Sequence, residues 1–378
     1  MLPILYAADT AAADFSKNGL GFLHGLESCY VWERLNGIFE LEAAGVKDPR
    51  RTVIPSMFLK AKPNKHDGAQ LFEVYKVTDT AGALTIAAQH VRYITFNNII
   101  TEAVTDGTAR TPAQWWAYIE DILACESYTT FTSPITATGV ITAGKDRPIR
   151  LGDFIVGAKG SMIDVFGGHL KYDNFDIQLL QRRGSKTGIA IRYGGNVSSY
   201  SQEIDSTTVY THLLPYAYIH AEESGSGKNL GERAIFGSVI DLNCTRLTYE
   251  RALSYDFSDY FRDDVILISP GSGAPVDTTA LMAKLNALSS SYVTRNGAAL
   301  REISASITID TGDALRSLQE VELGDTVLVE LGDLDGPVRV QVQGIKYDVL
   351  GERIDAVELG RVKKTLADLI GVKNIGGA

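Results

Sequence analysis

Apolar and polar residues alternate over short runs along much of the chain. Alternation is clear in residues 27–34 and again in residues 38–42. A period of two is typical of a strand that buries only one of its faces. Asn36 and Gly37 separate the two runs, and an Asn-Gly pair favours a type I′ turn. The pattern therefore predicts a β-hairpin at this point of the chain.

Similar runs predict strands elsewhere. Residues 70–77 and 83–91 form a second candidate strand pair, joined by residues 78–82. Residues 222–229 are polar and contain two glycines, which predicts a flexible surface loop. Residues 333–336 predict a turn. Further strands are predicted at residues 171–180 and 189–193, in a β-rich unit over residues 207–268, and at residues 326–331, 338–347 and 355–360.

Helices are predicted to be a minority. Thr111 is a good N-cap residue and Pro112 suits the first helical position, so a helix is predicted to begin there. Apolar residues then recur at spacings near three and four as far as Leu123. We interpret Trp115 and Trp116 within this set as core residues rather than as a partner-binding face. Other helices are predicted at residues 152–166, 277–292 and 363–378.

Composition indicates a folded protein with room for several domains. The chain has 378 residues, of which 45% are hydrophobic and 22% are charged. These values argue against a disordered, collagen-like or coiled-coil chain. No apolar run approaches the roughly 20 residues that span a bilayer. The first residues lack a basic segment and include Asp9 and Asp14, so no signal peptide is predicted and we expect synthesis and assembly in a cytoplasm.

Charge and cysteine content narrow the function classes further. Lys and Arg total 36 and Asp and Glu total 46, for a net charge of −10. An acidic chain is poorly suited to gripping duplex DNA, although DNA can still pass it. Cys29, Cys125 and Cys244 are far apart, so we predict buried free thiols rather than disulfides or a CxxC metal site. Cys125 in particular is expected to pack within the tryptophan-containing helix.

No enzyme motif is found. None of the six histidines lies in an HExxH motif; His212 and His220 leave a metal site open, but solvated or core positions are favoured. Residues 225–229 lack the spacing of a phosphate-binding loop, and no GxSxG motif occurs. The acidic pairs at residues 222–223 and 263–264 are typical of solvated turns. We therefore predict no catalytic, cofactor-binding or metal-ligating residue and no cofactor.

Three separated stretches carry motifs rich in glycine, asparagine and charged residues. They comprise residues 18–21, Leu26, 33–37 and 39–42; then 152–154, 160–161, 166–168, 173–175, 182–184 and 191–196; and finally 323–327, 347–350 and 357–360. Taken in order, this set resembles the hub proteins of phage tail tips and baseplates, a family also called prophage endopeptidase tail or phage minor structural protein. The resemblance extends over residues 15–365.

The resemblance implies a fold and a domain order. The implied fold is a β-rich α+β, multidomain baseplate-hub fold with two related β-barrel domains and smaller α+β domains. Residues 1–105 would form an N-terminal β-barrel, completed by part of residues 165–205, and residues 106–165 a helical α+β domain. Residues 206–320 would form a second β-barrel and α+β region, and residues 321–378 a C-terminal β domain with a terminal helix.

The resemblance also implies a function and partners. Three copies would form a ring with pseudo-sixfold symmetry below a hexameric distal tail protein, closing the tail tube and gating passage of the tape measure protein and DNA. A tail fibre, a spike or receptor-binding components would attach to it in the virion, and no membrane anchor is expected. DNA would pass without specific binding, and we hypothesise that acidic side chains face the lumen.

Some features of the family are not matched. Members called endopeptidases or tail-associated lysins commonly carry a wall-degrading module after the hub, whereas this chain stops soon after the closing motif, so we predict no peptidase activity. A peptidoglycan hydrolase remains an alternative, as does a receptor-binding adhesin that uses residues 222–231.

Two motifs within the resemblance are interpreted structurally. Residues 167–169 are interpreted as a tight turn. Arg182 and Arg183 are interpreted as subunit-interface residues rather than as a phosphate site.

Overall fold

The chain forms two compact units, which we describe separately. The computed structural model describes residues 2–104, 107–145, 147–192, 199–205, 207, 209–244, 247, 249–301, 304–310, 318–330 and 338–360. Unit 1 contains the residues before Glu203 and those from Ser306 to Gly360, and unit 2 contains Glu203–Ala305. Unit 2 is therefore an insertion in the sequence of unit 1.

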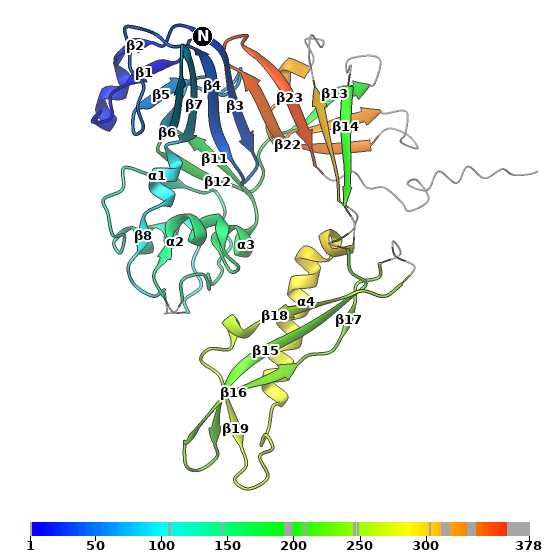
Figure 1. Cartoon of the computed structure of the whole chain (residues 1–378). Helices are drawn as coiled ribbons and strands as arrows, with labels where there is room; N and C mark the ends of the chain where they lie inside the picture. The colour runs from blue at the N-terminus through cyan, green and yellow to red at the C-terminus, as the bar shows by residue number, and fades with distance from the viewer. Residues whose placement is uncertain are drawn as a thin grey trace, which may run out of the picture. The chain divides into compact units, whose positions relative to one another are not determined.

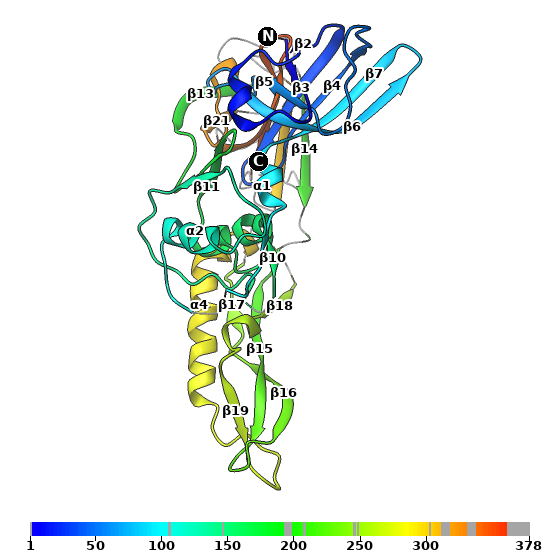
Figure 2. The same cartoon turned by 90° about the vertical axis from the view of Figure 1, so that its left-hand side faces the viewer.

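Unit 1 is built around a large curled sheet (Figure 1). Its strands follow the order β14-β20-β23-β22-β3-β4-β7-β6-β5-β1-β2, and β21 pairs with β22 and with β13. The hairpins β3–β4 and β6–β7 lie next to each other in it (Figure 2). The strands are β1 (Ile4–Tyr6), β2 (Gly21–Phe22), β3 (Leu26–Arg34), β4 (Phe39–Val46), β5 (Phe58–Ala61), β6 (Gln70–Thr80), β7 (Ala83–His90), β13 (Lys186–Arg192), β14 (Ser199–Asp205), β20 (Ser304–Asp310), β21 (Thr326–Glu330), β22 (Val338–Asp348) and β23 (Arg353–Leu359).

The predicted hairpin at the start of the chain is confirmed as β3 and β4, but its turn type is wrong. Asn36 has a φ of 51°, whereas Gly37 is not among the residues with positive φ. A type I′ turn needs positive φ at both positions. The Asn36 side chain instead makes tertiary hydrogen bonds to Gly168 and Leu170, so the local turn is adapted to a contact distant in sequence.

The later strand predictions are confirmed with one correction. The pair at residues 70–77 and 83–91 forms β6 and β7, which are joined by a tighter turn than predicted, and the closing runs form β21, β22 and β23. Residues 171–180 do not form one strand. Asn174 has a φ of 55°, which an extended strand does not tolerate, and the chain reverses there. The two resulting strands are β11 (His169–Asp173) and β12 (Asp176–Leu180), and β12 also pairs with β9 (Thr130–Thr132).

The helical part of unit 1 includes α2 (Pro112–Glu120), which begins as predicted. Thr111 accepts a hydrogen bond from the Gln114 amide and completes a capping box. Trp115 and Trp116 are 1% and 5% exposed, so their assignment to the core is confirmed. The other short elements are η1 (Ala12–Ser16), α1 (Arg92–Phe96), β8 (Ile99–Ile100), β10 (Ile149–Arg150), the π-helical turn η2 (Asp153–Gly157) and α3 (Met162–Phe166).

Two helix predictions in unit 1 need correction. The helix after Pro112 was expected to continue to Leu123 but ends at Glu120, so Cys125 lies beyond it and is exposed rather than packed. The helix predicted over residues 152–166 is two elements, η2 and α3, because Gly160 adopts a φ of 72° between them. Of the other cysteines, Cys29 is buried as predicted and Cys244 is half-buried.

Unit 2 is a five-stranded sheet with a long helix on one face (Figures 1 and 2). The helix predicted at residues 277–292 is confirmed as α4 (Thr279–Arg301), and Leu285 on it is fully buried. Glu222 and Glu223 belong to a strand, so the predicted loop is restricted to residues 224–228. The strands are β15 (His212–Glu223) at the centre, β16 (Asn229–Phe236), β17 (Ile240–Asp241), β18 (Ala252–Asp256) and β19 (Val265–Ile268), and η3 (Ser258–Tyr260) precedes β19.

Some predictions lie outside the described residues. These are the turn at residues 333–336, the helical tail at residues 363–378 and most of the motif at residues 191–196. The remaining element of unit 1 is η4 (Leu318–Glu320). Within the described part of the chain, no helix is both long enough and apolar enough to cross a bilayer.

Candidate functional site

The sequence motifs that are far apart in the chain meet at one place in unit 1, which we call the motif junction. Arg183, in the segment between β12 and β13, lies at its centre and is 9% exposed. Its Nη1 donates to Oε1 of Glu33 at 2.5 Å, and its Nη2 lies 3.4 Å from Oε2 of the same carboxylate. This two-point contact joins a residue of β3 to one that is 150 positions later.

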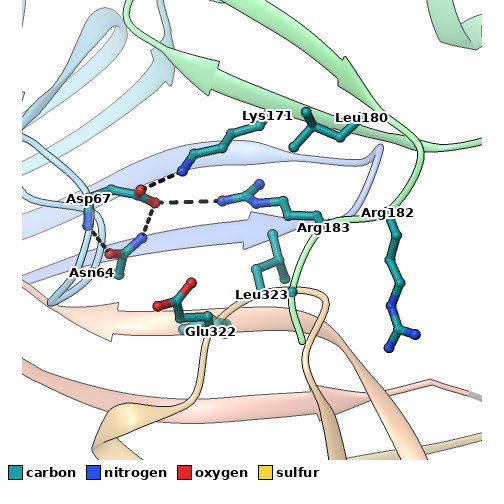
Figure 3. Close-up of a pocket in the computed structure, with 10 residues that line it drawn as sticks. Asn64, Asp67, Lys171, Leu180, Arg182, Arg183, Glu322 and Leu323 are labelled. Carbon is teal, nitrogen blue, oxygen red and sulfur yellow. Dashed lines mark hydrogen bonds and ion pairs between the residues drawn. The ribbon is translucent and has the colours of Figure 1, made fainter. Parts of the chain in front are cut away.

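A second carboxylate completes the charge cluster (Figure 3). Oδ2 of Asp67 lies 3.6 Å from Arg183 and accepts a hydrogen bond from Asn64 at 2.7 Å. Lys171 on β11 lies 3.2 Å from the other Asp67 oxygen. Burial opposes ionisation of Asp67, but the Asn64 hydrogen bond and the charges of Lys171 and Arg183 hold its pKa below the ordinary value.

The same two carboxylates keep Arg183 charged. Burial alone would lower the pKa of its guanidinium, but the charge and hydrogen bonds of Glu33, together with the charge of Asp67, raise it. Arg183, Glu33 and Asp67 therefore form a buried ion cluster in which each charge has a partner. A cavity of about 150 Å³ adjoins it and is lined by Asn64, Asp67, Lys171, Leu180, Arg182, Arg183, Gly184, Glu322, Leu323 and Ile345.

Two glycines next to Arg183 bring the middle and final motifs into backbone contact. Gly184 and Gly324 have φ values of 78° and 89°. A Cβ on Gly184 would lie 2.1 Å from the carbonyl carbon of Gly324, so only glycine fits there. Asp325 fastens the contact, because its Oδ1 accepts from the Ser185 amide at 2.7 Å and its Oδ2 from the Glu322 amide at 2.9 Å. The parallel pair β13–β21 begins directly after this contact.

The first motif contacts the middle motif through Asn36. Its Nδ2 donates to the Gly168 carbonyl at 2.9 Å, and its Oδ1 accepts from the Leu170 amide at 2.8 Å. Gly167 and Gly168 have φ values of 67° and 88°, so the predicted tight turn is confirmed. The turn places His169 so that its Nδ1 accepts from the Arg183 amide at 2.9 Å.

A second buried polar network in unit 1 joins β6, β7 and the turn between β11 and β12. His90 is fully buried and stacks on Phe39 with ring centroids 4.3 Å apart. Its Nδ1 accepts from the Arg92 amide, so its Nε2 carries the proton and donates to Oε1 of Gln70 at 3.1 Å. That same oxygen accepts from the Asn174 amide at 2.6 Å. Burial and the nearby Arg92 charge hold the pKa of His90 well below its ordinary value.

The interpretation of the arginine pair as interface residues is wrong for Arg183. Its guanidinium is occupied inside its own chain by Glu33. Arg182, by contrast, points away from the cluster in Figure 3 and donates to the hydroxyl of Thr326. A sequence signal for the buried pair did exist, because Glu33 occupies the inward position that Val31 takes two residues earlier on β3. A carboxylate on the buried face of a strand predicts a cationic partner, because a buried charge without a partner is unfavourable.

Other singled-out residues belong to unit 2 and not to the junction. His212 and His220 lie eight positions apart on β15, a separation of roughly 26 Å along a strand. Asp264 pairs with Lys284 at 2.5 Å, and Glu222 lies 3.4 Å from His220. Among the described residues, no group of three or more His, Cys, Asp or Glu side chains could hold a metal ion. The junction's own groups are arranged to hold segments together, since its charges and amides are used in internal contacts.

No protein-family model and no curated protein matches this chain. Solved structures do. Prophage tail protein gp18 from Listeria monocytogenes EGD-e aligns with a TM-score of 0.53 and 16% identity over 98% of each chain. The 43 kDa tail protein of prophage MuSo2 from Shewanella oneidensis aligns with a TM-score of 0.55 and 11% identity, over 96% of this chain and 98% of that one.

A tail protein from Neisseria meningitidis MC58 aligns with a TM-score of 0.53 and 10% identity, over 95% of this chain and 96% of that one. The chain thus has the fold of phage tail proteins across nearly its whole length. The resemblance stated from the sequence motifs is confirmed at the level of the fold. The predicted strand-rich fold with few helices is confirmed as well, and most of its strands form one large curled sheet.

Proposed function

We propose that this chain is the structural hub of a tail tip or baseplate in a phage or a phage-derived particle. The observation that carries the proposal is the shared fold with three prophage and tail proteins, each covered over at least 96% of its own length. The motif junction supports it. A buried ion cluster and a glycine-to-glycine backbone contact give a rigid joint between segments, which suits a structural part of an assembly.

The finer proposal follows the hub family. Three copies form a ring below a hexameric distal tail protein, close the tail tube, and gate the tape measure protein and then DNA. The two β-barrel domains and the four-part division at residues 105, 165, 205 and 320 belong to this proposal. A net charge of −10 supports a conduit that does not grip DNA. Tail fibre, spike or receptor-binding components then attach to the ring in the virion.

Solution mass tests the ring. Light scattering coupled to gel filtration is expected to give about 123 kDa, three times the 41.0 kDa chain. Antibody labelling of intact particles in the electron microscope is expected to mark the tip of the tail. A monomer that remains a monomer when mixed with the distal tail protein would contradict the ring, and label along the tail tube or on the capsid would contradict the location.

A non-catalytic role is part of the proposal. The purified chain is expected to leave purified peptidoglycan undegraded, in agreement with the paired, structural use of the charged groups at the junction. Release of soluble peptide or glycan fragments that is lost on substitution of an acidic residue would instead support the hydrolase.

A further inference from the structure

The sheet of unit 2 has two faces of different character. The side chains of β15 alternate between them, and Ala217, Ile219 and Ala221 point to the face that α4 covers, where they are at most 1% exposed. Tyr216 and Tyr218 point to the opposite face, which we call the outer face. Residues opposite one another in neighbouring strands share a face, so the pairing register defines the rest of it.

An aromatic and aliphatic cluster lies on the outer face. Tyr216 lies opposite Phe236 on β16, with ring centroids 6.4 Å apart, and 5.8 Å from Tyr218. Tyr218 and Phe236 are 49% and 56% exposed. On β19, Val265 and Leu267 lie opposite His220 and Glu222 and are 41% and 45% exposed. Several large apolar side chains exposed side by side on one sheet face are typical of an interaction surface.

The charged groups around this cluster have one sign. Carboxylates are contributed by β15, β16, β17 and β18. The pairing register defines which described residues of the five strands lie on this face, and none of these residues is Lys or Arg. The only cationic candidates there are His212 and His220, of which His220 lies beside a carboxylate at 3.4 Å. The four carboxylates are Glu222, Glu232, Asp241 and Asp256.

The acidic character of the outer face favours a cationic partner over a second copy of the same face. Two copies pairing through the same face would bring four carboxylates toward four carboxylates, which is unfavourable. We propose that the outer face binds a segment of another protein whose contacting side chains are apolar and flanked by Lys or Arg. The aromatic rings supply the buried contact area, and the surrounding carboxylates pair with the partner's cations and set its register. This inference rests on the proposed structural role and adds the chemistry of one partner.

A carbohydrate ligand is less well supported by the ring geometry. Stacking on a sugar needs a ring face that is free and flat. Here the planes of Tyr216 and Tyr218 are inclined by 86° and those of Tyr216 and Phe236 by 37°, so the three rings form a ridged surface.

The test uses the full chain and two labelled amphipathic peptides that differ only in charge. Both carry the same leucines and tyrosines; the charged positions are all Lys in one and all Glu in the other. Fluorescence anisotropy is expected to show at least about tenfold tighter binding of the Lys peptide, weakening as salt rises. The double variant Tyr218→Ser with Phe236→Ser is expected to weaken that binding by about tenfold or more. Tyr75→Ser is the matched control, because Tyr75 is 48% exposed on unit 1.

Each outcome decides the inference. Equal binding of both peptides, an unchanged affinity in the double variant, or an equal loss in Tyr75→Ser overturns it. Displacement of the Lys peptide by peptidoglycan-derived glycans reassigns the face to carbohydrate, and a smaller solution mass in the double variant reassigns it to a contact between copies. Circular dichroism on each variant establishes that it is folded. Because oligomeric mass is measured independently, a ring without peptide binding contradicts this inference alone, and peptide binding without a ring contradicts only the proposed function.

Discussion

The motif junction of unit 1 and the core of unit 2 are stabilised in different ways. At the junction, Arg183 and Glu33 are both at least nine-tenths buried and form an ion pair, and two glycines bring backbone into contact with backbone. In unit 2, α4 covers the sheet with apolar side chains such as Leu285, and Phe261, which follows η3, packs in the same core. Apolar packing tolerates shape changes better than a buried charge tolerates loss of its partner. We therefore expect loss of one charged partner at the junction to lower the free energy of unfolding strongly, and expect the unit 2 core to accept changes of apolar side chains more readily.

Loss of the central arginine is expected to have the largest effect. Arg183→Ala leaves Glu33 buried without its partner and should lower the free energy of unfolding of unit 1 by about 3–5 kcal/mol. Tryptophan fluorescence during urea unfolding measures this selectively, because the three tryptophans, Trp32, Trp115 and Trp116, all belong to unit 1. Arg182→Ala, whose side chain points away from the cluster, is the control and should cost less than about 1 kcal/mol.

The double variant Glu33→Met with Arg183→Met sharpens this result. Replacing both partners of a buried ion pair by apolar residues is often close to neutral. The double variant should therefore lose much less free energy of unfolding than the Glu33→Met and Arg183→Met single variants lose together. Additive losses would show that the pair acts only through packing.

Truncating a core residue of unit 2 should affect that unit alone. Leu285→Ala removes a fully buried side chain between α4 and the sheet and should cost about 2–5 kcal/mol. Far-UV circular dichroism is expected to show earlier loss of helix, while the tryptophan transition of unit 1 stays in place. A shift of the tryptophan transition by the same amount would show that the two units unfold together.

The glycine contact should be more sensitive than a glycine in open space. Gly324 and Gly225 have φ values of 89° and 87°, but a Cβ on Gly324 would lie 2.3 Å from the Arg183 carbonyl oxygen, and one on Gly225 would meet nothing within 4 Å. Both alanine variants carry backbone strain of about 1 kcal/mol, and Gly324→Ala adds a steric clash worth about 1–3 kcal/mol more. Urea unfolding measures the free energy of unfolding of both variants. Equal decreases would show that the close backbone contact at Gly324 does not contribute to stability.

The pH dependence of unit 1 should reveal its buried histidine. His90 is neutral when folded and its pKa lies well below the ordinary value, which the unfolded chain regains at about 6.5. Its contribution to stability is thus complete above about pH 6.5 and is lost as the pH falls, with a slope of up to about 1.4 kcal/mol per pH unit. Urea midpoints from pH 7 to pH 5 measure the slope. His90→Gln should reduce it, and an unchanged slope would assign it to other groups such as His169, whose pKa is also lowered by burial.

The local elements were largely predictable, and the site was not. Alternation identified β3, β4, β6, β7 and the closing strands, because a strand that buries one face repeats every two residues. The capping box identified the start of α2. The motifs around Asn36, Arg183 and Gly324 were found as separate pieces, and the contacts between them were not predicted, because residues that meet across 132 or more positions leave no local periodicity.

What the sequence determined by itself were the features that depend on neighbours along the chain: strand periodicity, a helix cap, glycine turns, the acidic balance and the ordered motifs that resemble tail hubs. Tertiary structure decided the rest. It gave Arg183 a partner in Glu33 instead of in another subunit, ended α2 before Cys125, and left Tyr218 and Phe236 on the outer face of the unit 2 sheet about half exposed. Burial and pairing depend on which distant segments pack together, and packing is a property of the whole fold.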